Sequence, residues 1–506
     1  MLACVLSAAV NGIEAFPVEV EVNAGYGDTL IVIVGLPDAA VKESRDRVGT
    51  ALTNSGYRVP MGRTTINLAP ADVRKEGPSF DLPIAVGTLA ASEQLETRRL
   101  GDFILVGELA LTGAVRPVKG VLPIALRARA EGRRGVIVAA ENAAEAAVVA
   151  GLEVIAVRNL REAADFLAGG LQLAPTTVDL EHIFDQPWTE DVDFADVKGQ
   201  ESVKRALEIA AAGGHNVLLI GPPGTGKSML AKRLPTILPP LTLGEALETT
   251  RIHSIAGLLA PGQALVTRRP FRAPHHTASD AGLLGGNVNP TPGEISIAHH
   301  GVLFLDELPE FKRTVLETMR QPLEEGRVTI SRAAGTVTFP SQFMLVAAMN
   351  PTPDGRMPGE SRCSPREIQG YLNRVSGPLL DRIDLHIEVP PVKFAEMTGG
   401  RPGEASAAVR ERVIAARRRQ QERFGGRLTC NARMGSRELK ACATPDEATL
   451  ELLRHAMQEL NLSARAYDRI LKVARTIADL AGTEAVAAEH VLEAVQCRTL
   501  DRQLWG

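Results

Sequence analysis

The sequence predicts an α/β protein in three parts: an N-terminal α+β domain, a central α/β core and a C-terminal helical domain. Three observations predict this class. Short strand and helix patterns mix at the start, helices alternate with short apolar strands around GPPGTGKS in the middle, and helical patterns fill the end. An acidic, proline-punctuated stretch separates the first two parts. The expected boundaries are 1–170 for the first domain, 171–195 for the linker, 196–392 for the core and 393–506 for the helical domain.

The composition is that of a folded protein without membrane spans. The 506 residues give room for about three domains, and no apolar run approaches the roughly 18 residues of a membrane-crossing helix. The apolar start MLACVLSAAV has no basic residue before Lys42, so we expect a buried first strand rather than a signal peptide. Five scattered cysteines favour a reducing cytoplasm over a disulfide framework. The net charge of −4 does not by itself indicate a nucleic-acid partner.

Three stretches define the expected N-terminal elements. VEVEVNAGYGDTLIVIVG (18–35) alternates and then becomes apolar, which predicts a β-hairpin that turns at its central glycines. Residues 38–56 have helical periodicity and end at Gly56, a residue type that is common at helix ends. GVIVAAENAAEAAVVAGLEVIAV (135–157) predicts a strand, a helix and a second strand.

The stretch 215–238 carries a phosphate-binding pattern. An apolar strand, HNVLLI, runs into the glycine-rich turn GPPGTGKS, and the helical pattern MLAKRLPTIL follows. This context is that of a P-loop, which holds a nucleoside triphosphate with backbone N–H groups and the partial positive charge of the helix start. We expect Lys227 to reach the β- and γ-phosphates and Ser228 to hold Mg²⁺. The residues expected to contact the nucleotide are Gly221, Pro222, Pro223, Gly224, Thr225, Gly226, Lys227 and Ser228.

Two further apolar strands end in polar side chains. GVLFLDELPEF places Asp306 and Glu307 at a strand tip, where Asp306 suits a magnesium ligand and Glu307 suits the base that polarises the attacking water. FMLVAAMNP ends in Asn350, whose amide suits a sensor of the γ-phosphate. An asparagine that merely begins a turn before Pro351 is the alternative. Together the three strand tips predict an ATPase of the additional-strand class that uses ATP and Mg²⁺.

The chain resembles the AAA+ ATPases of the magnesium-chelatase-like group and, within it, the bacterial competence branch. The stretches that carry the resemblance are VNGIEAFPVEVEV, GLPDAAVKESRDRV, INLAPADVRKEGPSFDLPIA, RPFRAPHHTASDAGLLGG, PGEISIAHHGVLFLDELPEF and GPLLDRIDLHIEVP. The resemblance implies an N-terminal domain like ribosomal protein S5 and Lon proteases, an AAA+ P-loop core and a C-terminal helical lid. It also implies a ring, expected to be a homohexamer, that migrates DNA branches during recombination or natural transformation.

Matching family positions assigns further roles. Arg382 in LLDRIDLH matches the arginine finger that reaches the γ-phosphate bound by the neighbouring subunit, where a cation stabilises transition-state charge. Pairing of this arginine with Asp381 or Asp384 is the alternative. Arg465 in LSARAYDRILKVAR matches sensor 2 on the lid, and Arg469, one helical turn away, is the rival position.

Arginines in two regions are candidates for DNA contact. VTIS and TVTFP predict a β-hairpin within 321–343, and related ring helicases project such a hairpin into the central pore. Residues 401–433 hold nine arginines, three glutamates and no lysine or aspartate. The alternatives are a surface arginine at the hairpin turn and a solvated helix face. The candidate DNA contacts are Arg332 at the hairpin tip and the triplet Arg417, Arg418 and Arg419.

In the loop after sensor 1 the sequence departs from its relatives. Many relatives have several cysteines there, whereas MNPTPDGRMPGESRCSP holds only Cys363, so we expect no zinc site and a loop ordered by local turns. The histidine pairs at 275–276 and 299–300 lack the cysteines or spaced acidic residues that would complete a metal site.

The N-terminal domain departs from proteases of similar fold. EGPSFDLPIAVGTLAA places Ser79 at the nucleophile position of Lon-like proteases, and GELALTGAVRPVKGVLPIALRARAEG is similar to the loop that carries their lysine. That lysine position holds Leu122, and Lys119 comes three residues early, so proteolysis is not expected. Ser79 is expected instead to cap the helix that follows.

These observations favour an ATP-driven ring motor on DNA, either a helicase or a branch-migration enzyme. One alternative is an AAA+ protein-remodelling subunit of the magnesium-chelatase type. A Lon-like ATP-dependent protease is the less favoured alternative.

Overall fold

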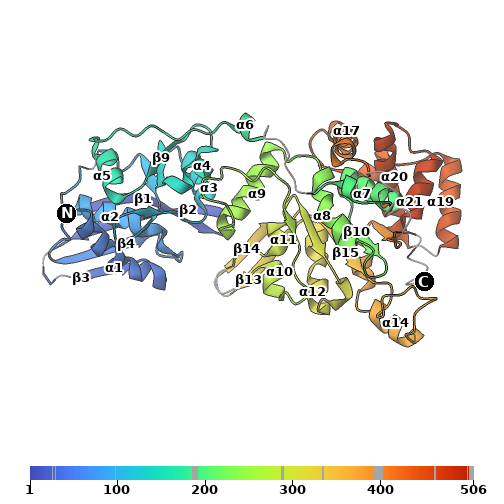
Figure 1. The fold of residues 1–506 in the computed structure, drawn as a ribbon. Coiled ribbons are helices and arrows are strands. Elements are labelled where there is room, and N and C mark those ends of the chain that lie inside the picture. Colours follow the sequence, from blue (N-terminus) through green and yellow to red (C-terminus); the bar gives the residue numbers. More distant parts are fainter. Residues whose placement is uncertain are drawn as a thin grey trace. The chain divides into compact units, whose positions relative to one another are not determined.

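The computed structural model describes residues 1–25, 27–28, 30–96, 98–184, 192–286, 290–332, 335–392, 403–460, 463–498 and 500. The chain folds into two compact units (Figure 1). The first unit contains Met1–Gln186 and Leu243–Thr267, and the second contains Pro187–Thr242 and Arg268–Gly506. The first change of unit falls within the expected linker, whereas the return of 243–267 to the first unit is a feature that the expected contiguous core does not include.

The first unit contains a four-stranded sheet with the order β1-β2-β4-β3. Its strands are β1 (Leu2–Asn11), β2 (Glu14–Ala24), β3 (Leu30–Val34) and β4 (Arg63–Ala69). β2 pairs antiparallel with both β1 and β4, and β3 pairs parallel with β4. The hairpin expected over 18–35 is wrong, because β4 separates its two strands. The helix α1 (Ala39–Asn54) joins β3 to β4, and parallel neighbours need such a crossover instead of a tight turn.

A second set of short strands and helices completes this unit. Three strands pair in parallel in the order β5-β8-β9, and β6 pairs antiparallel with β7. The helix expected within 38–56 is confirmed by α1, and the strand–helix–strand pattern over 135–157 is confirmed by β8, α4 and β9. The bounds are η1 Pro78–Phe80, α2 Asp81–Ala91, β5 Phe103–Leu105, β6 Glu108–Leu109, β7 Val115–Arg116, α3 Val121–Ala130, β8 Gly135–Ala139, η2 Ala140–Asn142, α4 Ala143–Ala147, β9 Glu153–Val157, α5 Leu160–Ala168 and α6 Leu180–Phe184.

The segment 243–267 is anchored in the first unit although it lies between parts of the second in sequence. It contains α9 (Leu243–Ala256), and Leu265 is buried in the same apolar cluster as α3 and β8. The Ser254 hydroxyl donates a hydrogen bond to the buried carboxyl group of Glu145. Burial raises the pKa of Glu145, against the effect of the hydrogen bonds that it accepts. The segment therefore belongs to the first unit although it joins two stretches of the second unit in sequence.

The second unit is built on a five-stranded parallel sheet with the order β11-β12-β15-β10-β16 (Figure 1). Its strands are β10 (Val217–Ile220), β11 (Phe271–Arg272), β12 (Val302–Leu305), β15 (Met344–Met349) and β16 (Leu385–Glu388). All residues of β10, β12 and β15 are buried, as expected for parallel strands that are covered on both faces. β15 lies between β10 and β12, which is the strand arrangement of the additional-strand class.

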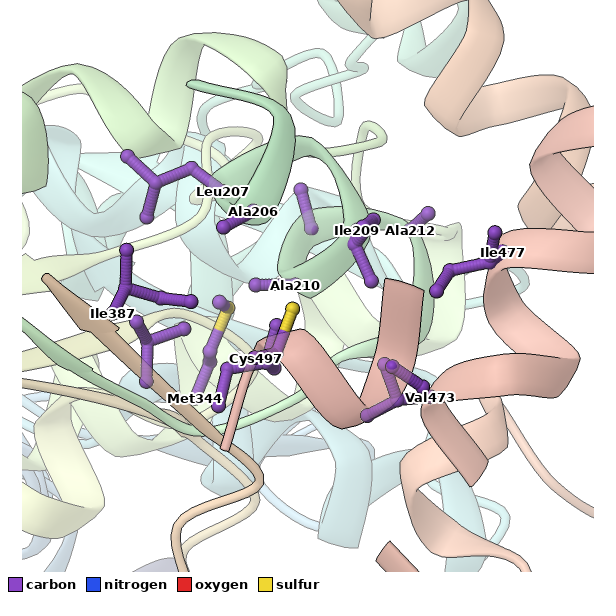
Figure 2. Close-up of a cluster of buried hydrophobic side chains, with 14 of the residues drawn as sticks. Ala206, Leu207, Ile209, Ala210, Ala212, Met344, Ile387, Val473, Ile477 and Cys497 are labelled. Atoms are coloured by element: carbon purple, nitrogen blue, oxygen red, sulfur yellow. The ribbon is translucent and has the colours of Figure 1, made fainter. Parts of the chain in front are cut away.

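Helices of the core and of the C-terminal part enclose this sheet. Figure 2 shows a buried cluster in which Ala206 and Ile209 of α7 lie near Met344 of β15, Ile387 of β16 and Ile477 of α20. The core elements are η3 Phe194–Asp196, α7 Glu201–Gly213, α8 Lys227–Ile237, α10 Asp280–Leu284, α11 Glu294–Ile297, η4 Leu308–Glu310, α12 Arg313–Thr318, α13 Arg320–Glu325, α14 Pro365–Leu372 and α15 Gly377–Leu380. The C-terminal elements are α17 Ser406–Phe424, η5 Asn431–Arg433, α18 Ser436–Cys442, α19 Glu447–Glu459, α20 Ala464–Ala481 and α21 Ala488–Gln496.

The hairpin expected within 321–343 is confirmed. β13 (Arg327–Arg332) pairs antiparallel with β14 (Gly335–Pro340). One face is buried, and the other carries hydroxyl pairs. The buried residues are Val328, Ile330, Val337 and Phe339, and the hydroxyl pairs are Thr329 with Thr338 (3.2 Å) and Ser331 with Thr336 (3.1 Å). The turn residues 333–334 lie outside the described residues.

Among the described residues, no helix is both long enough and apolar enough to cross a membrane.

Candidate nucleotide-binding site

The P-loop joins the buried end of β10 to the first residue of α8. Gly224 and Gly226 have φ angles of 78° and 86°, a region that residues with a Cβ rarely adopt. Gly221 is restricted by space instead, because a Cβ there would lie 2.3 Å from the carbonyl oxygen of Val389, just past β16. The Thr225 hydroxyl donates to the Pro222 carbonyl at 3.0 Å and closes the turn.

Lys227 is the first residue of α8, and its side chain folds back over the turn. Its amine donates to the carbonyl oxygens of Gly221 at 2.6 Å and Pro222 at 2.9 Å. The residue is only 8% exposed, and burial lowers the pKa of its amine while the charge of Asp306 opposes that effect. A buried cation whose present acceptors are neutral carbonyls is well placed to accept an anionic partner in their place.

Ser228 and the tip of β12 meet beside this lysine. The Ser228 hydroxyl donates to Asp306 Oδ2 at 2.6 Å, and the other carboxylate oxygen accepts the backbone N–H of Glu307 at 3.0 Å. Glu307 has a left-handed backbone, with φ of 53°, and its exposed carboxylate lies clear of the strand. A hydroxyl beside a carboxylate is a pair of oxygen ligands that suits Mg²⁺.

Asn350 completes the group of strand tips. It directly follows β15, and its side-chain oxygen accepts a hydrogen bond from the Lys227 amine at 3.3 Å. Because β15 lies between β10 and β12, the ends of all three strands meet at one edge of the sheet. The structure therefore brings together Lys227, Ser228, Asp306 and Asn350, four side chains that are up to 123 residues apart in sequence.

Gln200 is a residue at this site that the sequence analysis missed. It precedes α7 with a left-handed backbone, with φ of 56°. Its side-chain N–H group donates to the carbonyl oxygens of Thr225 at 2.8 Å and Pro390 at 3.0 Å, so it joins the P-loop to the segment after β16. No local pattern marks this role, because both partners lie far away in sequence.

His276 is the second missed residue. Its Nδ1 lies 3.2 Å from a carboxylate oxygen of Glu307, and its ring packs against His275, with 4.1 Å between ring centroids. In the sequence alone, this histidine suggests only a metal ligand. Its proximity to Glu307 instead makes it a residue that can fix the orientation of that carboxylate.

Arg382 is held by a residue that neither sequence alternative named. Its guanidinium donates to the Glu324 carboxylate and to the Pro378 carbonyl, and neither Asp381 nor Asp384 is its ion-pair partner. Its side chain is 10% exposed and that of Glu324 is 58% exposed. The pair thus lies at the surface, with the arginine on the inner side.

The two candidates for sensor 2 have different environments on α20. Arg465 is largely exposed and pairs with Asp381 at 2.9 Å. Arg469 is mostly buried and pairs at 2.8 Å with Asp384, which is itself fully buried. Burial alone would raise the pKa of Asp384, but the charge of Arg469 and the proximity of His215, whose Nδ1 lies 3.4 Å from the carboxylate, hold it below its usual value. Arg469 therefore secures α20 to the residue before β16, whereas Arg465 lies largely exposed on the same helix.

The loop after β15 is ordered by Asp354. This carboxylate accepts hydrogen bonds from the Thr352 hydroxyl at 2.7 Å, the Ser361 hydroxyl at 2.9 Å and the Arg362 backbone N–H at 2.9 Å. Cys363, the one cysteine of the loop, donates its backbone N–H to the Ser361 hydroxyl at 3.2 Å. Local turns thus order this loop, while the expectation that it holds no zinc stays a prediction.

The four candidate DNA contacts differ in their surroundings. The side chain of Arg332 lies outside the described residues. Arg417 donates to the carbonyls of Ala211 and Ala212 and so caps the end of α7, and Arg419 donates to a carbonyl at the end of α20. Such contacts satisfy carbonyls that a helix end leaves without partners. Arg418 is exposed on α17.

The residues that bear on proteolysis lie in the first unit. Ser79 is half-buried within η1, and neither η1 nor α2 has a side-chain cap, so the expected capping role of Ser79 is wrong. Ser79 lies inside the short 3₁₀ turn η1. It is two residues after Gly77, which precedes η1, and one residue before Phe80, which precedes α2. Leu122 is fully buried in α3, and the side chain of Lys119 lies across Gly257.

The fold and the site define an α/β protein of the P-loop, additional-strand class. Three family models match the chain: "Magnesium chelatase, subunit ChlI" over 193–397, "Subunit ChlI of Mg-chelatase" over 18–142 and "Magnesium chelatase, subunit ChlI C-terminal" over 403–498. The chain belongs to the magnesium chelatase ChlI family.

The chain is similar to some relatives along its whole length and to others over part of it. The chain is 47% identical to competence protein ComM of Haemophilus influenzae over 507 residues, covering 99% of this chain and 98% of that protein. It is 46% identical to the uncharacterized protein YifB of Salmonella typhimurium over similar shares of both chains. It is 27% identical to the magnesium-chelatase 67 kDa subunit of Heliobacterium mobile, over 38% of this chain and 30% of that protein.

Proposed function

We propose that this chain is an ATP-driven motor that assembles into a ring and moves branched DNA during recombination or natural transformation. The observation that carries the proposal is the meeting of Lys227, Ser228, Asp306 and Asn350 at the tips of three adjacent strands. The full-length similarity to a competence protein supports DNA as the substrate of the proposed motor.

The residues of the site fit ATP and Mg²⁺. The Lys227 amine would exchange its loop carbonyls for phosphate oxygens, and Ser228 and Asp306 would supply oxygen ligands to the metal. Bound Mg²⁺ would neutralise charge that develops on the β- and γ-phosphates. Glu307 would accept the proton of the attacking water, and Asn350 would orient that water against the γ-phosphate.

The neighbouring copy would complete each site. Arg382 would contact the triphosphate that an adjacent subunit binds and stabilise the negative charge of the transition state. Arg465 on the lid would contact the triphosphate that is bound by its own subunit. In any closed ring every site receives such a finger, and we propose that the ring is a homohexamer.

DNA would be gripped by its phosphates. The hairpin β13–β14 carries Arg332 at its end, and the exposed Arg418 lies on α17. Arg417 and Arg419 contribute less to this proposal, because helix-end carbonyls already occupy their guanidinium groups. Phosphate contacts would make DNA binding weaken with added salt.

The domain organisation and the cellular location belong to the same proposal. The N-terminal unit would have the fold shared by ribosomal protein S5 and Lon proteases and would serve as a binding or assembly module. The domains would be 1–170, 196–392 and 393–506, and the protein would act in the cytoplasm.

A protein-remodelling ATPase of the magnesium-chelatase type is the second candidate. It is favoured by the family models, which carry the magnesium chelatase description over both units. A Lon-like protease is less favoured, since the fully buried Leu122 occupies the position of its lysine. ATP-dependent casein cleavage that Ser79→Ala abolishes would support the protease.

The proposal is tested by ATP turnover of the assembled protein with and without single-stranded and forked DNA. We expect DNA to stimulate turnover, and we expect ATP-dependent migration of a Holliday junction or unwinding of the fork. Glu307→Gln is expected to bind ATP and assemble normally but to turn over about 100-fold more slowly, since it lacks the general base.

Two results would contradict this proposal. ATP turnover that does not respond to any DNA would contradict the proposal of a DNA motor and favour a protein-remodelling ATPase. Normal turnover by Glu307→Gln would exclude Glu307 as the base. Arg332→Glu is the matched test of the hairpin, because a DNA contact predicts loss of stimulation with basal turnover retained.

A further inference from the structure

Glu324 forms an ion pair with Arg382. In the proposed function, Arg382 acts on the triphosphate that the neighbouring subunit binds. The guanidinium uses one Nη to reach Glu324 and the other to reach the Pro378 carbonyl. Its Nε is buried and has no hydrogen-bond partner among the described residues. The arginine is thus turned inward and is only partly satisfied there.

Space beside the pair allows the arginine to move. Arg382 and Glu324 line a surface cavity of about 490 Å³, together with Leu284 of α10 and with Val328 and Thr329 of the hairpin. An arginine on the wall of an open cavity can leave a partly exposed carboxylate without displacing the core.

Glu324 is directly connected to the hairpin β13–β14. It lies in the last turn of α13, Gly326 ends that helix with φ of 65°, and β13 begins at Arg327. The joint is held by two backbone hydrogen bonds, from Gly326 to Pro322 at 2.9 Å and from Ser341 to Gly326 at 2.8 Å. A displacement of the hairpin would therefore move Glu324 away from Arg382, which lies on the separate segment before β16.

The strength of the pair suits a reversible contact. An ion pair with a 58% exposed partner is stabilised only weakly, since water screens it. A triphosphate offers an arginine more charge and two acceptors at once, so it can displace a single carboxylate.

We propose that Glu324 is a positioning residue that holds Arg382 turned inward until hairpin movement releases it towards the triphosphate of the adjacent subunit. This inference rests on the proposed function, in which Arg382 acts across the interface and the hairpin contacts DNA. Binding of DNA by one subunit then increases hydrolysis at the site that its arginine serves.

The variant Glu324→Gln tests this inference, and Glu325→Gln is its matched control. Glu325 is adjacent and equally charged, but it pairs with Arg327 at 3.0 Å instead of with Arg382. We expect Glu324→Gln to raise the DNA-free kcat by about fivefold, which is the upper range for losing one partly exposed ion pair, with KM for ATP unchanged. The ratio of DNA-stimulated to DNA-free turnover falls accordingly. Glu325→Gln is expected to leave both values as in the wild type.

The double variant Glu324→Gln with Arg382→Ala separates this role from a general loosening of the fold. If Glu324 acts through Arg382, the double variant turns over as slowly as Arg382→Ala alone. An unchanged DNA-free kcat in Glu324→Gln would overturn the proposal. A lower kcat in an assembled Glu324→Gln ring would also overturn it, because Glu324 would then orient Arg382 for catalysis.

The proposed function can fail separately. A wild-type ring whose ATP turnover is not changed by DNA would contradict the proposal of a DNA motor. A DNA-free increase in Glu324→Gln that disappears without Arg382 would still support the positioning role.

Discussion

Single side chains at the site illustrate how one residue can order a segment. Asp354 gathers two hydroxyls and a backbone N–H around one carboxylate, and Gly355 beside it packs so closely on the P-loop that an added Cβ would lie 2.7 Å from Pro223. The hydrogen bonds from Arg362 and Thr352 hold the pKa of Asp354 below its ordinary value of 3.8. The ionised form of this residue therefore orders a loop that contacts the nucleotide-binding turn.

We expect Asp354→Ala to open this loop to proteolysis. Trypsin should cleave after Arg356 and Arg362 about tenfold faster than in the wild type, since a carboxylate that accepts several hydrogen bonds is lost. Because the folded pKa is depressed, the carboxylate's contribution is present above the unfolded pKa of 3.8 and is lost only as the pH falls below it. Wild-type protection, measured relative to a peptide substrate, should thus be equal at pH 8 and pH 5. Equal cleavage of both proteins would show that other contacts order the loop.

At the scale of elements, the site depends on how closely β10 and β16 approach at their ends. The Val389 backbone N–H donates to the Ile220 carbonyl at 2.7 Å. This hydrogen bond places the carbonyl oxygen of Val389 next to Gly221. The P-loop therefore begins in a space that only glycine fits. Gln200 adds a second restraint from α7.

Gly221→Ala is expected to distort the P-loop. Its Cβ would meet a backbone oxygen that cannot rotate away, so the strand ends must separate at a cost of about 1–3 kcal/mol. We expect a lower melting temperature for the nucleotide-binding unit and weaker binding of a fluorescent ATP analogue. Gly359→Ala is the control, since nothing lies within 4 Å of its added Cβ. Wild-type binding by Gly221→Ala would mean that the loop accommodates the methyl group.

In the whole molecule, the chain passes between the two units three times. The P-loop helix α8 is followed by segment 243–267, which is anchored in the N-terminal unit through Ser254 and Glu145. The proposed ring adds a further level, because Arg382 would act on a triphosphate that its own subunit does not bind.

Mixing two inactive variants tests the shared site. Lys227→Ala removes the phosphate-binding amine but retains Arg382, whereas Arg382→Ala retains an intact P-loop. We expect each variant alone to be nearly inactive and the mixture to recover part of the wild-type turnover, since mixed interfaces pair an intact P-loop with an intact finger. Assembly of both variants is checked by light scattering. A mixture that assembles and stays inactive would place Arg382 in its own subunit's site or outside catalysis.

The motifs that depend on spacing along the chain could be predicted from the sequence alone. GPPGTGKS after an apolar strand predicts the P-loop, apolar runs with polar tips predict β12 and β15, and alternation predicts β13–β14. Each of these is a local pattern, and turn geometry or strand burial alone explains why it folds as it does.

The contacts between distant groups became visible only in the folded chain. In the folded chain, β4 lies between β2 and β3, and residues 243–267 belong to the first unit. Glu324 pairs with Arg382, and His276 lies beside Glu307. Gln200 forms a hydrogen bond with the P-loop. The physical reason is that ion pairs and hydrogen bonds between residues tens to hundreds of positions apart leave no periodicity in the chain. Their partners are chosen by strand order and packing, which exist only once the whole fold has formed.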